Sequence, residues 1–142
     1  MMKILLTGSN GMVGKNILAH NSAINYNFLT PSSKDLNLLN YQDVKKYIAI
    51  HQPEFVIHAA GKVGGIQANI KEPVSFLIDN IDMGRNIIMA AKSNNIKNFL
   101  NLSSSCMYPR NAINPLSENL ILKGELEPTN EGYAIAKIMS TR

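Results

Sequence analysis

Apolar and polar residues follow one another along this chain in two alternating patterns. Short, continuous apolar runs, typical of strands buried on both faces of a parallel sheet, predict strands at 3–7, 26–30, 54–58 and 97–103. Apolar residues three and four positions apart predict helices at 15–20, 41–51, 73–94 and from 128 onward. Strands that alternate with helices indicate an α/β fold with a Rossmann-type, doubly wound parallel sheet. With right-handed crossovers, we expect the strand order 3-2-1-4.

The longest predicted helix begins at Glu72–Pro73 and ends near Asn94. Its apolar stripe consists of Ile78, Ile81, Ile87, Ile88 and Ala91. Asn80, a polar residue within this helix, is a candidate for supporting a catalytic group rather than acting itself. The segments 62–69 and 110–130 contain glycine, proline and many polar residues, so they are predicted to be loops.

The fourth predicted strand has no later strand beside it, so it would form an open apolar edge of the sheet. An edge of this kind favours association with further polypeptide. We therefore expect residues 1–142 to be an incomplete NADP-binding Rossmann domain, the N-terminal part of a longer enzyme that is truncated before the later strands and the substrate-binding lobe.

A glycine-rich turn follows the first predicted strand and leads into the first predicted helix. Its glycines are three positions apart. The first permits a tight turn, the second lets the backbone approach a pyrophosphate, and the third lets helix and strand pack closely. Because a helix N-terminus offers free N–H groups and a partial positive charge, this turn predicts a dinucleotide site. Its candidate cofactor-binding residues are Gly8, Asn10, Gly11, Met12, Val13 and Gly14.

The end of the second predicted strand bears on the choice of cofactor. An NAD site usually places a carboxylate there to accept from the ribose 2′-hydroxyl. Here Ser32, Ser33 and Lys34 follow instead, and these groups suit a 2′-phosphate, so NADP(H) is the expected cofactor. The small residues Ala59 and Ala60, after the third strand, would let the cofactor lie close to the backbone.

Candidate catalytic chemistry lies in the last third of the chain. Tyr133 and Lys137 are four positions apart and therefore share one helix face. Because a cation beside a phenol favours the phenolate, we expect Lys137 to lower the pKa of Tyr133. Ser104, at the exit of the fourth strand, is placed to act beside a nicotinamide ring. Taken alone, Cys106 is more typical of a small buried apolar residue, and His58 of a packed strand residue.

Composition narrows the classes of function. The 142 residues are 45% apolar and 17% charged, as in globular proteins, and the net charge of +4 comes from scattered basic residues. This distribution suits a small anion such as a nucleotide and argues against nucleic acid as a partner. One cysteine cannot form an internal disulfide, and no His/Cys cluster has the spacing of metal ligands. Without a signal or membrane-spanning pattern, we expect a cytoplasmic protein that binds neither metal nor membrane.

Combined with these motifs, three longer blocks make the chain resemble a known family. The glycine turn, Ser104 and the pair Tyr133 and Lys137 resemble the extended short-chain dehydrogenase/reductase superfamily. More narrowly, residues 62–66, 104–109 and 126–137 are similar to the GDP-L-fucose synthase family, and the resemblance spans essentially the whole chain. It implies NADPH-dependent 3,5-epimerisation and 4-reduction of GDP-4-keto-6-deoxymannose.

The resemblance also implies roles for individual residues. Ser104 would hydrogen-bond the C4 oxygen of the sugar and Tyr133 would protonate it. Lys137 would hold the cofactor ribose and lower the pKa of the tyrosine. Cys106 would be the epimerisation base, a role that needs a thiolate. The partner acid in this family is a histidine downstream of the tyrosine helix, which this chain does not reach.

Two departures from the family pattern stand out. Gly132 stands where proline is often found, which predicts a looser helix start. Asn10 and Ser33 stand where arginines often face the 2′-phosphate, which shifts that role toward Lys34. The resemblance further implies a homodimer, in which the helix near 74–94 and the tyrosine helix pair across a two-fold axis into a four-helix bundle.

Two alternatives stay open on the sequence. One is a sibling enzyme that acts on another GDP-sugar, such as a 3,6-dideoxy sugar epimerase-reductase or a GDP-mannose epimerase. The other is a truncated, non-catalytic nucleotide-binding protein. The pair of Ser104 and Cys106 separates the first interpretation, a 3,5-epimerase-4-reductase, from plain 4-epimerases, which do not need the thiol.

Overall fold

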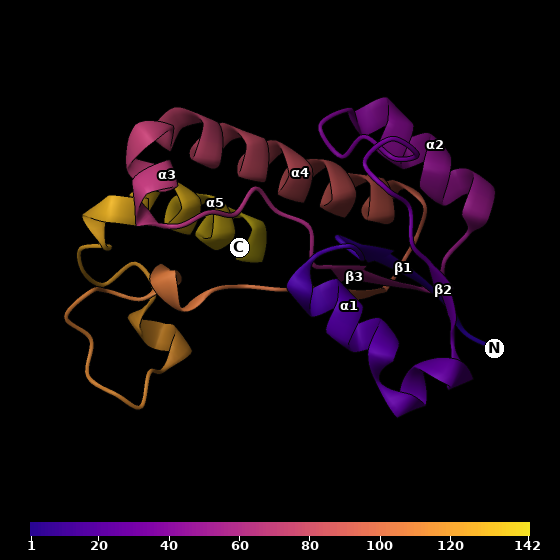
Figure 1. Cartoon of the computed structure of the whole chain (residues 1–142), viewed down its shortest axis with the longest axis horizontal. Helices are drawn as coiled ribbons and strands as arrows, with labels where there is room; N and C mark the ends of the chain where they lie inside the picture. Colours follow the sequence, from indigo (N-terminus) through magenta and orange to yellow (C-terminus); the bar gives the residue numbers. More distant parts are fainter. The chain divides into compact units, whose positions relative to one another are not determined.

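The computed structural model describes all residues, 1–142, and confirms the predicted alternation of strands and helices (Figure 1). The strands are β1 (Lys3–Thr7), β2 (Asn27–Leu29), β3 (Phe55–His58) and β4 (Asn98–Asn101). The α-helices are α1 (Met12–Ala19), α2 (Tyr41–His51), α3 (Ile66–Lys71), α4 (Pro73–Ser93) and α5 (Glu131–Thr141). Short 3-10 helices are η1 (Asn21–Asn25), η2 (Ser105–Met107), η3 (Glu118–Leu120) and η4 (Pro128–Asn130). The chain forms two compact units, residues 1–61 with 82–102 and residues 62–81 with 103–142.

The sheet belongs to the first unit, and its strand order differs from the prediction. All pairs are parallel, but the order is β2-β1-β3-β4 and not 3-2-1-4. The chain runs from β1 to β2 on one side and then crosses to the other side of β1, so the winding reverses between β1 and β3. The alternation of strands and helices could not decide this order, because right-handed crossovers permit either one. The fourth strand is an edge strand, as predicted.

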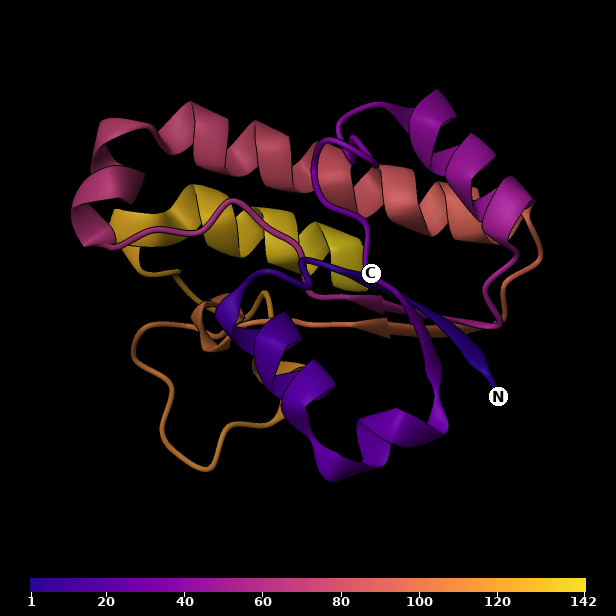
Figure 2. The same ribbon diagram turned by 45° about the vertical axis from the view of Figure 1, so that its right-hand side comes forward.

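One face of this sheet is covered by helices. Figure 2 shows α2 and the later part of α4 on that face, and α1 on the opposite face. Strand register places Leu5, Val56 and Phe99 in one row across the covered face. They pack with Leu36, with Val44 and Ile48 of α2, and with Ile87, Ala90 and Ala91 of α4. This cluster is the core of the first unit, and it confirms Ile87 and Ala91 as part of the predicted stripe.

Two predictions about helices were wrong. The segment 62–69, predicted to be a loop, contains the start of α3, where the Asn69 side-chain amide donates to the carbonyls of Gly64 and Gly65. Ile78, predicted in the apolar stripe of α4, is 46% exposed, whereas Phe76 and Asn80 are the buried residues of that part. None of the helices has the length and apolar character needed to span a membrane.

Candidate functional site

The glycine turn of the first unit depends on the absence of side chains. Gly8 has a φ of 73°, in the left-handed region, and a Cβ there would lie 2.6 Å from the amide nitrogen of Ala60. A Cβ on Gly14 would overlap the Gly8 carbonyl oxygen and the backbone of Ser9. Gly11 closes the turn by donating its N–H to the Gly8 carbonyl at 3.0 Å. The tight turn and the close packing are therefore as predicted.

The N-terminus of α1 is open to an anion. Gly11 is its N-cap, no side chain caps the helix, and the first turn holds no acidic residue. Asn10, Met12 and Val13 around it are exposed. Free N–H groups and the positive end of the helix dipole therefore face solvent at the glycine turn. This donor set fits the pyrophosphate of a dinucleotide.

The ends of β1 and β3 are tied together beside this turn. Thr7 Oγ1 lies 2.8 Å from His58 Nδ1 and accepts from the Ala60 N–H at 3.4 Å, and the Thr7 carbonyl accepts from the Ala59 N–H at 3.2 Å. Thr7 and His58 are both buried, which agrees with His58 as a packed strand residue. These bonds hold Ala59 and Ala60 against Gly8. Sequence reasoning missed Thr7, although a hydroxyl at the end of a buried strand was an available signal.

The turn after β2 leaves two of its three polar side chains without internal partners. Ser32 is occupied, since its hydroxyl donates to Asp35 Oδ2 at 2.6 Å and its N–H donates to the same oxygen at 3.0 Å. These hydrogen bonds lower the pKa of Asp35. Ser33 and Lys34 are exposed, and Lys34 has no ion-pair partner. Ser33 and Lys34, rather than Ser32, are thus the groups available to a 2′-phosphate.

The candidate catalytic residues lie in the second unit. Here η2, which holds Cys106, packs against α5, which holds Tyr133 and Lys137. The Cys106 thiol donates to Ser104 Oγ at 3.2 Å. Lys137 Nζ lies 5.7 Å from the centroid of the Tyr133 ring, and Lys137 is only 7% exposed. The structure therefore brings together a hydroxyl, a thiol, a phenol and an ammonium.

The pKa of Tyr133 is shifted in the direction opposite to the prediction. Burial raises the pKa of Tyr133, and the nearby Cys106 raises it further. Burial also lowers the pKa of Lys137, while Cys106 acts to raise it. The expectation that Lys137 lowers the pKa of Tyr133 was therefore wrong for this protein, because loss of water around the phenol is the largest cause of the shift and acts in the opposite direction. A phenol is already protonated at neutral pH, and the raised pKa leaves Tyr133 in that state, so this residue can donate a proton.

A second polar cluster fixes the segment after β3 to the start of α4. The Asn80 side chain accepts from the Lys62 N–H at 2.8 Å and donates to the Lys62 carbonyl at 3.0 Å. The Lys62 ammonium lies 3.3 Å from Glu72 and 3.3 Å from Asp79, and it also contacts Ser75. Asn80 thus supports a backbone segment, not a catalytic side chain.

Gly132 lies where the start of α5 approaches the start of α4. A Cβ at this position would lie 2.9 Å from the Pro73 carbonyl oxygen and 3.2 Å from Leu77 Cβ. Because α5 begins at Glu131, Gly132 lies in its first turn, directly before Tyr133. Close packing between two helices, rather than flexibility, explains a glycine here.

Together these features define the class of protein to which the chain belongs. A parallel sheet with a glycine turn at an uncapped helix is the fold of dinucleotide-binding α/β proteins, and a Tyr–Lys pair beside a serine suits carbonyl chemistry. No group of three or more His, Cys, Asp or Glu side chains is placed to hold a metal ion. A family model described as the NAD dependent epimerase/dehydratase family matches residues 4–142. The chain belongs to this family.

Individual relatives narrow the comparison. GDP-L-colitose synthase of Yersinia pseudotuberculosis is 60% identical over 99% of this chain and 46% of its own length. GDP-L-fucose synthase of Azorhizobium caulinodans is 46% identical over 99% of this chain and 45% of its own length. A solved GDP-mannoheptose C4 reductase from Campylobacter jejuni with NADP bound has a TM-score of 0.91 and 30% identity, over 98% of this chain and 44% of its own. The chain thus spans about half the length of the curated relatives it matches.

Proposed function

We propose that this chain holds the cofactor turn and the reactive side chains of an NADP(H)-dependent GDP-sugar epimerase-reductase. The observation that carries the proposal is the cluster of Ser104, Cys106, Tyr133 and Lys137, in which a buried lysine lies beside a phenol whose pKa is raised by burial. Relatives named as GDP-L-colitose and GDP-L-fucose synthases support the substrate class. In this proposal, residues 1–142 form the NADP-binding domain.

The cofactor would be held mainly by backbone groups. The N-terminus of α1, with Gly8, Asn10, Gly11, Met12, Val13 and Gly14 around it, would bind the pyrophosphate. Ser33 and Lys34 would contact the 2′-phosphate, and Ala59 and Ala60 would let the cofactor lie close to the strand ends. Lys137 would hold the nicotinamide ribose. Bound NADPH supplies the hydride for reduction at C4.

Reduction also needs a proton for the C4 oxygen. Tyr133 is suited to provide it, because its phenol is protonated at neutral pH and can donate when the oxygen becomes basic. Ser104 would donate a hydrogen bond to the same oxygen. Its hydroxyl already accepts from Cys106, which leaves its own hydrogen free to point toward a substrate.

Epimerisation needs a base that removes a proton beside the keto group. Cys106 is the candidate, and the ammonium of Lys137 is close enough for the two charges to interact. Ser104, held at 3.2 Å from the sulfur, would keep Cys106 near the sugar carbon that Cys106 deprotonates.

The particular sugar has two candidates. Resemblance in the blocks 62–66, 104–109 and 126–137 favours GDP-4-keto-6-deoxymannose, with GDP-L-fucose as the product. The higher identity to a GDP-L-colitose synthase, 60% against 46%, favours a GDP-keto sugar that lacks the 3-hydroxyl. A sugar without a 3-hydroxyl has no stereocentre at C3, so only inversion at C5 would matter for it.

The test uses the chain joined to the unmatched part of the Yersinia relative, and it compares both GDP-keto sugars in heavy water with NADPH. We expect NADPH oxidation with at least one sugar and deuterium incorporation beside its keto group. Tyr133→Phe should slow oxidation by about 10² to 10⁴ while exchange persists. Cys106→Ser should abolish exchange.

Several outcomes would contradict this function. Oxidation that is unchanged in Tyr133→Phe would remove the phenol from the reaction, and exchange that is unchanged in Cys106→Ser would remove the thiol. If the isolated chain binds NADPH but the joined protein reduces neither sugar, the chain is a non-catalytic nucleotide-binding protein. A clear preference for NADH over NADPH would overturn the cofactor assignment.

The implied homodimer also belongs to this proposal. In the second unit, Val74 and Ile78 of α4 and Ile135 and Met139 of α5 are exposed apolar residues spaced four apart. Such stripes suit a bundle with the same two helices of another copy. Ile78→Glu should dissociate the dimer in sedimentation experiments, while Ile50→Glu on α2 should leave it intact. A chain that sediments as a monomer before any substitution would contradict the bundle.

A further inference from the structure

The reactive side chains of the second unit come from two segments that are far apart in the sequence. Ser104 and Cys106 follow β4, and their side chains are 3.2 Å apart. Tyr133 and Lys137 belong to α5, where the ammonium lies 5.7 Å from the ring centroid. Each of these two contacts lies within one segment. Whether a serine hydroxyl and a phenol can reach the same sugar oxygen therefore depends on how the two segments are spaced.

One hydrogen bond between side chains joins the two segments. Ser103 Oγ lies 3.1 Å from Thr141 Oγ1, and the two residues are 38 positions apart in the sequence. Ser103 directly precedes Ser104, and Thr141 is the last residue of α5, about one helical turn after Lys137. All four residues lie in the second unit. The bond thus connects the residue next to Ser104 with the helix turn that begins at Lys137.

A second hydrogen bond fixes the direction of this connection. Thr141 Oγ1 donates to the Lys137 carbonyl at 2.9 Å. A hydroxyl has only one hydrogen, so the hydrogen of Thr141 is already used within the helix. Ser103 is therefore the donor and Thr141 the acceptor in the bond between the two hydroxyls. The connection ends on the backbone of Lys137, the residue whose ammonium belongs to the reactive cluster.

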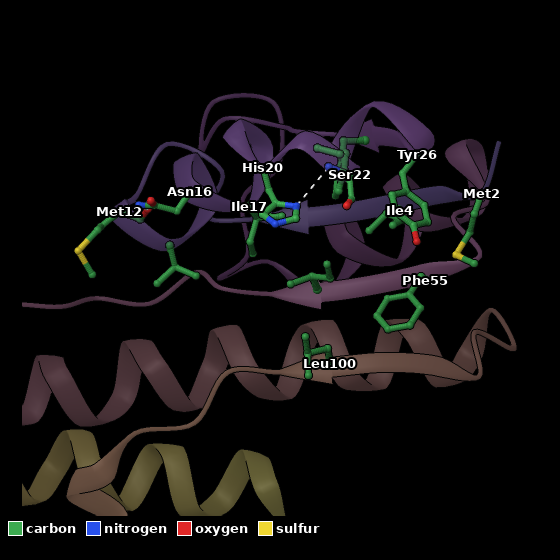
Figure 3. Close-up of a pocket in the computed structure, with 14 residues that line it drawn as sticks. Met2, Ile4, Met12, Asn16, Ile17, His20, Ser22, Tyr26, Phe55 and Leu100 are labelled. Carbon is green, nitrogen blue, oxygen red and sulfur yellow. Dashed lines mark hydrogen bonds between the residues drawn. The ribbon is translucent and has the colours of Figure 1, made fainter.

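Other polar side chains of the molecule bond only to near neighbours in the sequence. A hollow of about 750 Å³ in the first unit, lined mainly by apolar residues, gives two examples (Figure 3). The Asn16 side-chain amide donates to the Met12 carbonyl at 2.8 Å, and His20 Nδ1 accepts from the Ser22 N–H at 3.2 Å. Bonds of this kind stabilise a single turn of the chain. The bond between Ser103 and Thr141 instead constrains two separate segments.

The exposure of this bond separates a role in spacing from a role in stability. Ser103 and Thr141 are both exposed, so water competes for their hydroxyls and the bond contributes little to the free energy of unfolding. Removing the Thr141 hydroxyl also leaves the Lys137 carbonyl with a donor, because Ser140 Oγ donates to it at 3.1 Å. Substitutions at these two positions therefore remove the connection and leave the rest of α5 intact.

We propose that Ser103 and Thr141 are positioning residues, whose hydrogen bond sets the spacing between the segment after β4 and helix α5. They take no part in the reaction themselves and act through Ser104 and Tyr133. This inference rests on the proposed function, because the spacing matters for catalysis only if Ser104 and Tyr133 act on one sugar oxygen.

The first experiment uses the 142-residue chain without substrate. Ser103→Ala, Thr141→Val and the double variant remove the bond, whereas Thr141→Ser keeps the hydroxyl. The readout is the pKa of Tyr133, measured by tyrosinate absorbance, and a Tyr133→Phe counterpart of each variant identifies the signal. Ser93→Ala is the matched control, because it removes a hydroxyl that donates to the Ala90 carbonyl within α4.

The pKa of Tyr133 should fall when the bond is removed. Burial raises this pKa, and Cys106 raises it further, and both effects weaken if α5 moves away from η2. Ser103→Ala and Thr141→Val should therefore lower the pKa of Tyr133 equally. Because the two substitutions remove the same bond, the double variant should lower it no further. Thr141→Ser and the control should keep the pKa of the unsubstituted chain.

The second experiment measures the reaction in the chain joined to the unmatched part of the Yersinia relative. Ser103→Ala should slow the oxidation of NADPH by about threefold to tenfold, the factor that corresponds to one hydrogen bond of this kind. The KM for NADPH should not change, because the glycine turn is untouched. Thr141→Val should have the same effect as Ser103→Ala, and Thr141→Ser should restore the rate.

Four results would overturn the proposal. The first is a pKa of Tyr133 that is unchanged in both Ser103→Ala and Thr141→Val, even if urea unfolding shows a small loss of stability. The second is an additive effect in the double variant, which would mean that the two hydroxyls act separately. The third is a Thr141→Ser variant that behaves like Thr141→Val. The fourth is a lowered pKa with an unchanged rate of reduction.

Failure of the proposed function gives a different result. The joined protein would then reduce neither sugar, while the pKa of Tyr133 in the 142-residue chain would still respond to Ser103→Ala.

Discussion

The glycine turn and the tyrosine cluster are built in opposite ways. In the turn, Gly8 and Gly14 leave space in which backbone atoms approach closely, and the chemical groups offered are backbone N–H groups. In the cluster, Tyr133, Lys137 and Cys106 offer side-chain groups whose protonation depends on burial and on one another. The backbone geometry of the turn therefore changes when a substitution adds atoms, whereas the protonation of the cluster changes when a substitution removes them.

The two regions differ in how much of their character can be inferred from residue types alone. A position that must be empty tolerates one residue type, and glycine in the sequence reveals it directly. A pKa depends on the surroundings of a group, so the residue type alone does not determine it. Substitutions that add or remove single atoms can test whether the two regions differ in this way.

The largest effect should come from Gly14→Ala. Its Cβ would overlap the Gly8 carbonyl and Ser9, so the turn must move. We expect the affinity of the chain for NADPH to fall by roughly 100-fold, measured by fluorescence titration. The free energy of unfolding should fall by about 1–3 kcal/mol. Gly65→Ala is the control, because a Cβ at Gly65 has nothing within 4 Å. It should leave the NADPH affinity unchanged and, as a change at the N-cap of α3, lower the unfolding free energy by less than Gly14→Ala.

Gly132→Ala sharpens the comparison, because it adds an atom next to the side-chain cluster. Helix propensity alone predicts stabilisation by about 1 kcal/mol. The approach of 2.9 Å to the Pro73 carbonyl predicts the opposite, a loss of about 1–2 kcal/mol as α5 shifts. Urea unfolding measures whether the free energy of unfolding rises or falls in Gly132→Ala. A gain in stability would mean that the gap between α4 and α5 widens without cost.

The cluster is tested by a substitution that removes the Cys106 sulfur, with the pKa of Tyr133 as the measured quantity. In Cys106→Ala, the pKa of Tyr133 should fall but stay above its ordinary value, because burial is the larger cause of the shift. Tyrosinate absorbance during a pH titration measures this change, and Tyr133→Phe identifies the signal. An unchanged pKa in Cys106→Ala would show that the thiol does not act on the phenol.

The same shift has a consequence for stability. A phenol whose pKa is raised by folding contributes stability that is fully present below its unfolded pKa of about 10. This contribution is lost as the pH rises through the folded pKa. The unfolding free energy of Tyr133→Phe should therefore fall less steeply at alkaline pH than that of the unsubstituted chain.

The smallest effect should come from Lys62→Met. Its ion pairs with Glu72 and Asp79 are partly exposed, so they contribute about 1 kcal/mol or less. High salt should reduce the difference in unfolding free energy between Lys62→Met and the unsubstituted chain, measured by urea unfolding. A loss well above this value would mean that Lys62, and not only Asn80, fixes the segment after β3.

Much of the fold was predictable because it depends on near neighbours in the chain. The bounds of β1 and α2 agree with the prediction. In α2, for example, Asn40 caps the helix by accepting from the N–H groups of Gln42 and Asp43. The glycine turn was predictable for the same reason, since its spacing of three residues reflects contacts within one turn.

Apart from α3, whose contacts are local, what was mispredicted depends on contacts between distant residues. Ile78 is apolar and in helical register, yet it is exposed because no element of the second unit covers it. The pKa of Tyr133 was predicted from Lys137 alone, four positions away, but burial and then Cys106 are the causes of its shift, and both raise it. Neither effect is visible in a local pattern.

The sequence by itself determined the alternation of strands and longer helices, though not α3, the position of the glycine turn and the residues proposed for the candidate site, because each depends on residue types a few positions apart. Only the tertiary structure decided the strand order β2-β1-β3-β4, the exposure of Leu100 in β4 and the raised pKa of Tyr133. These three properties depend on which distant segments lie side by side and how much water they exclude. Local alternation of apolar and polar residues does not specify such contacts.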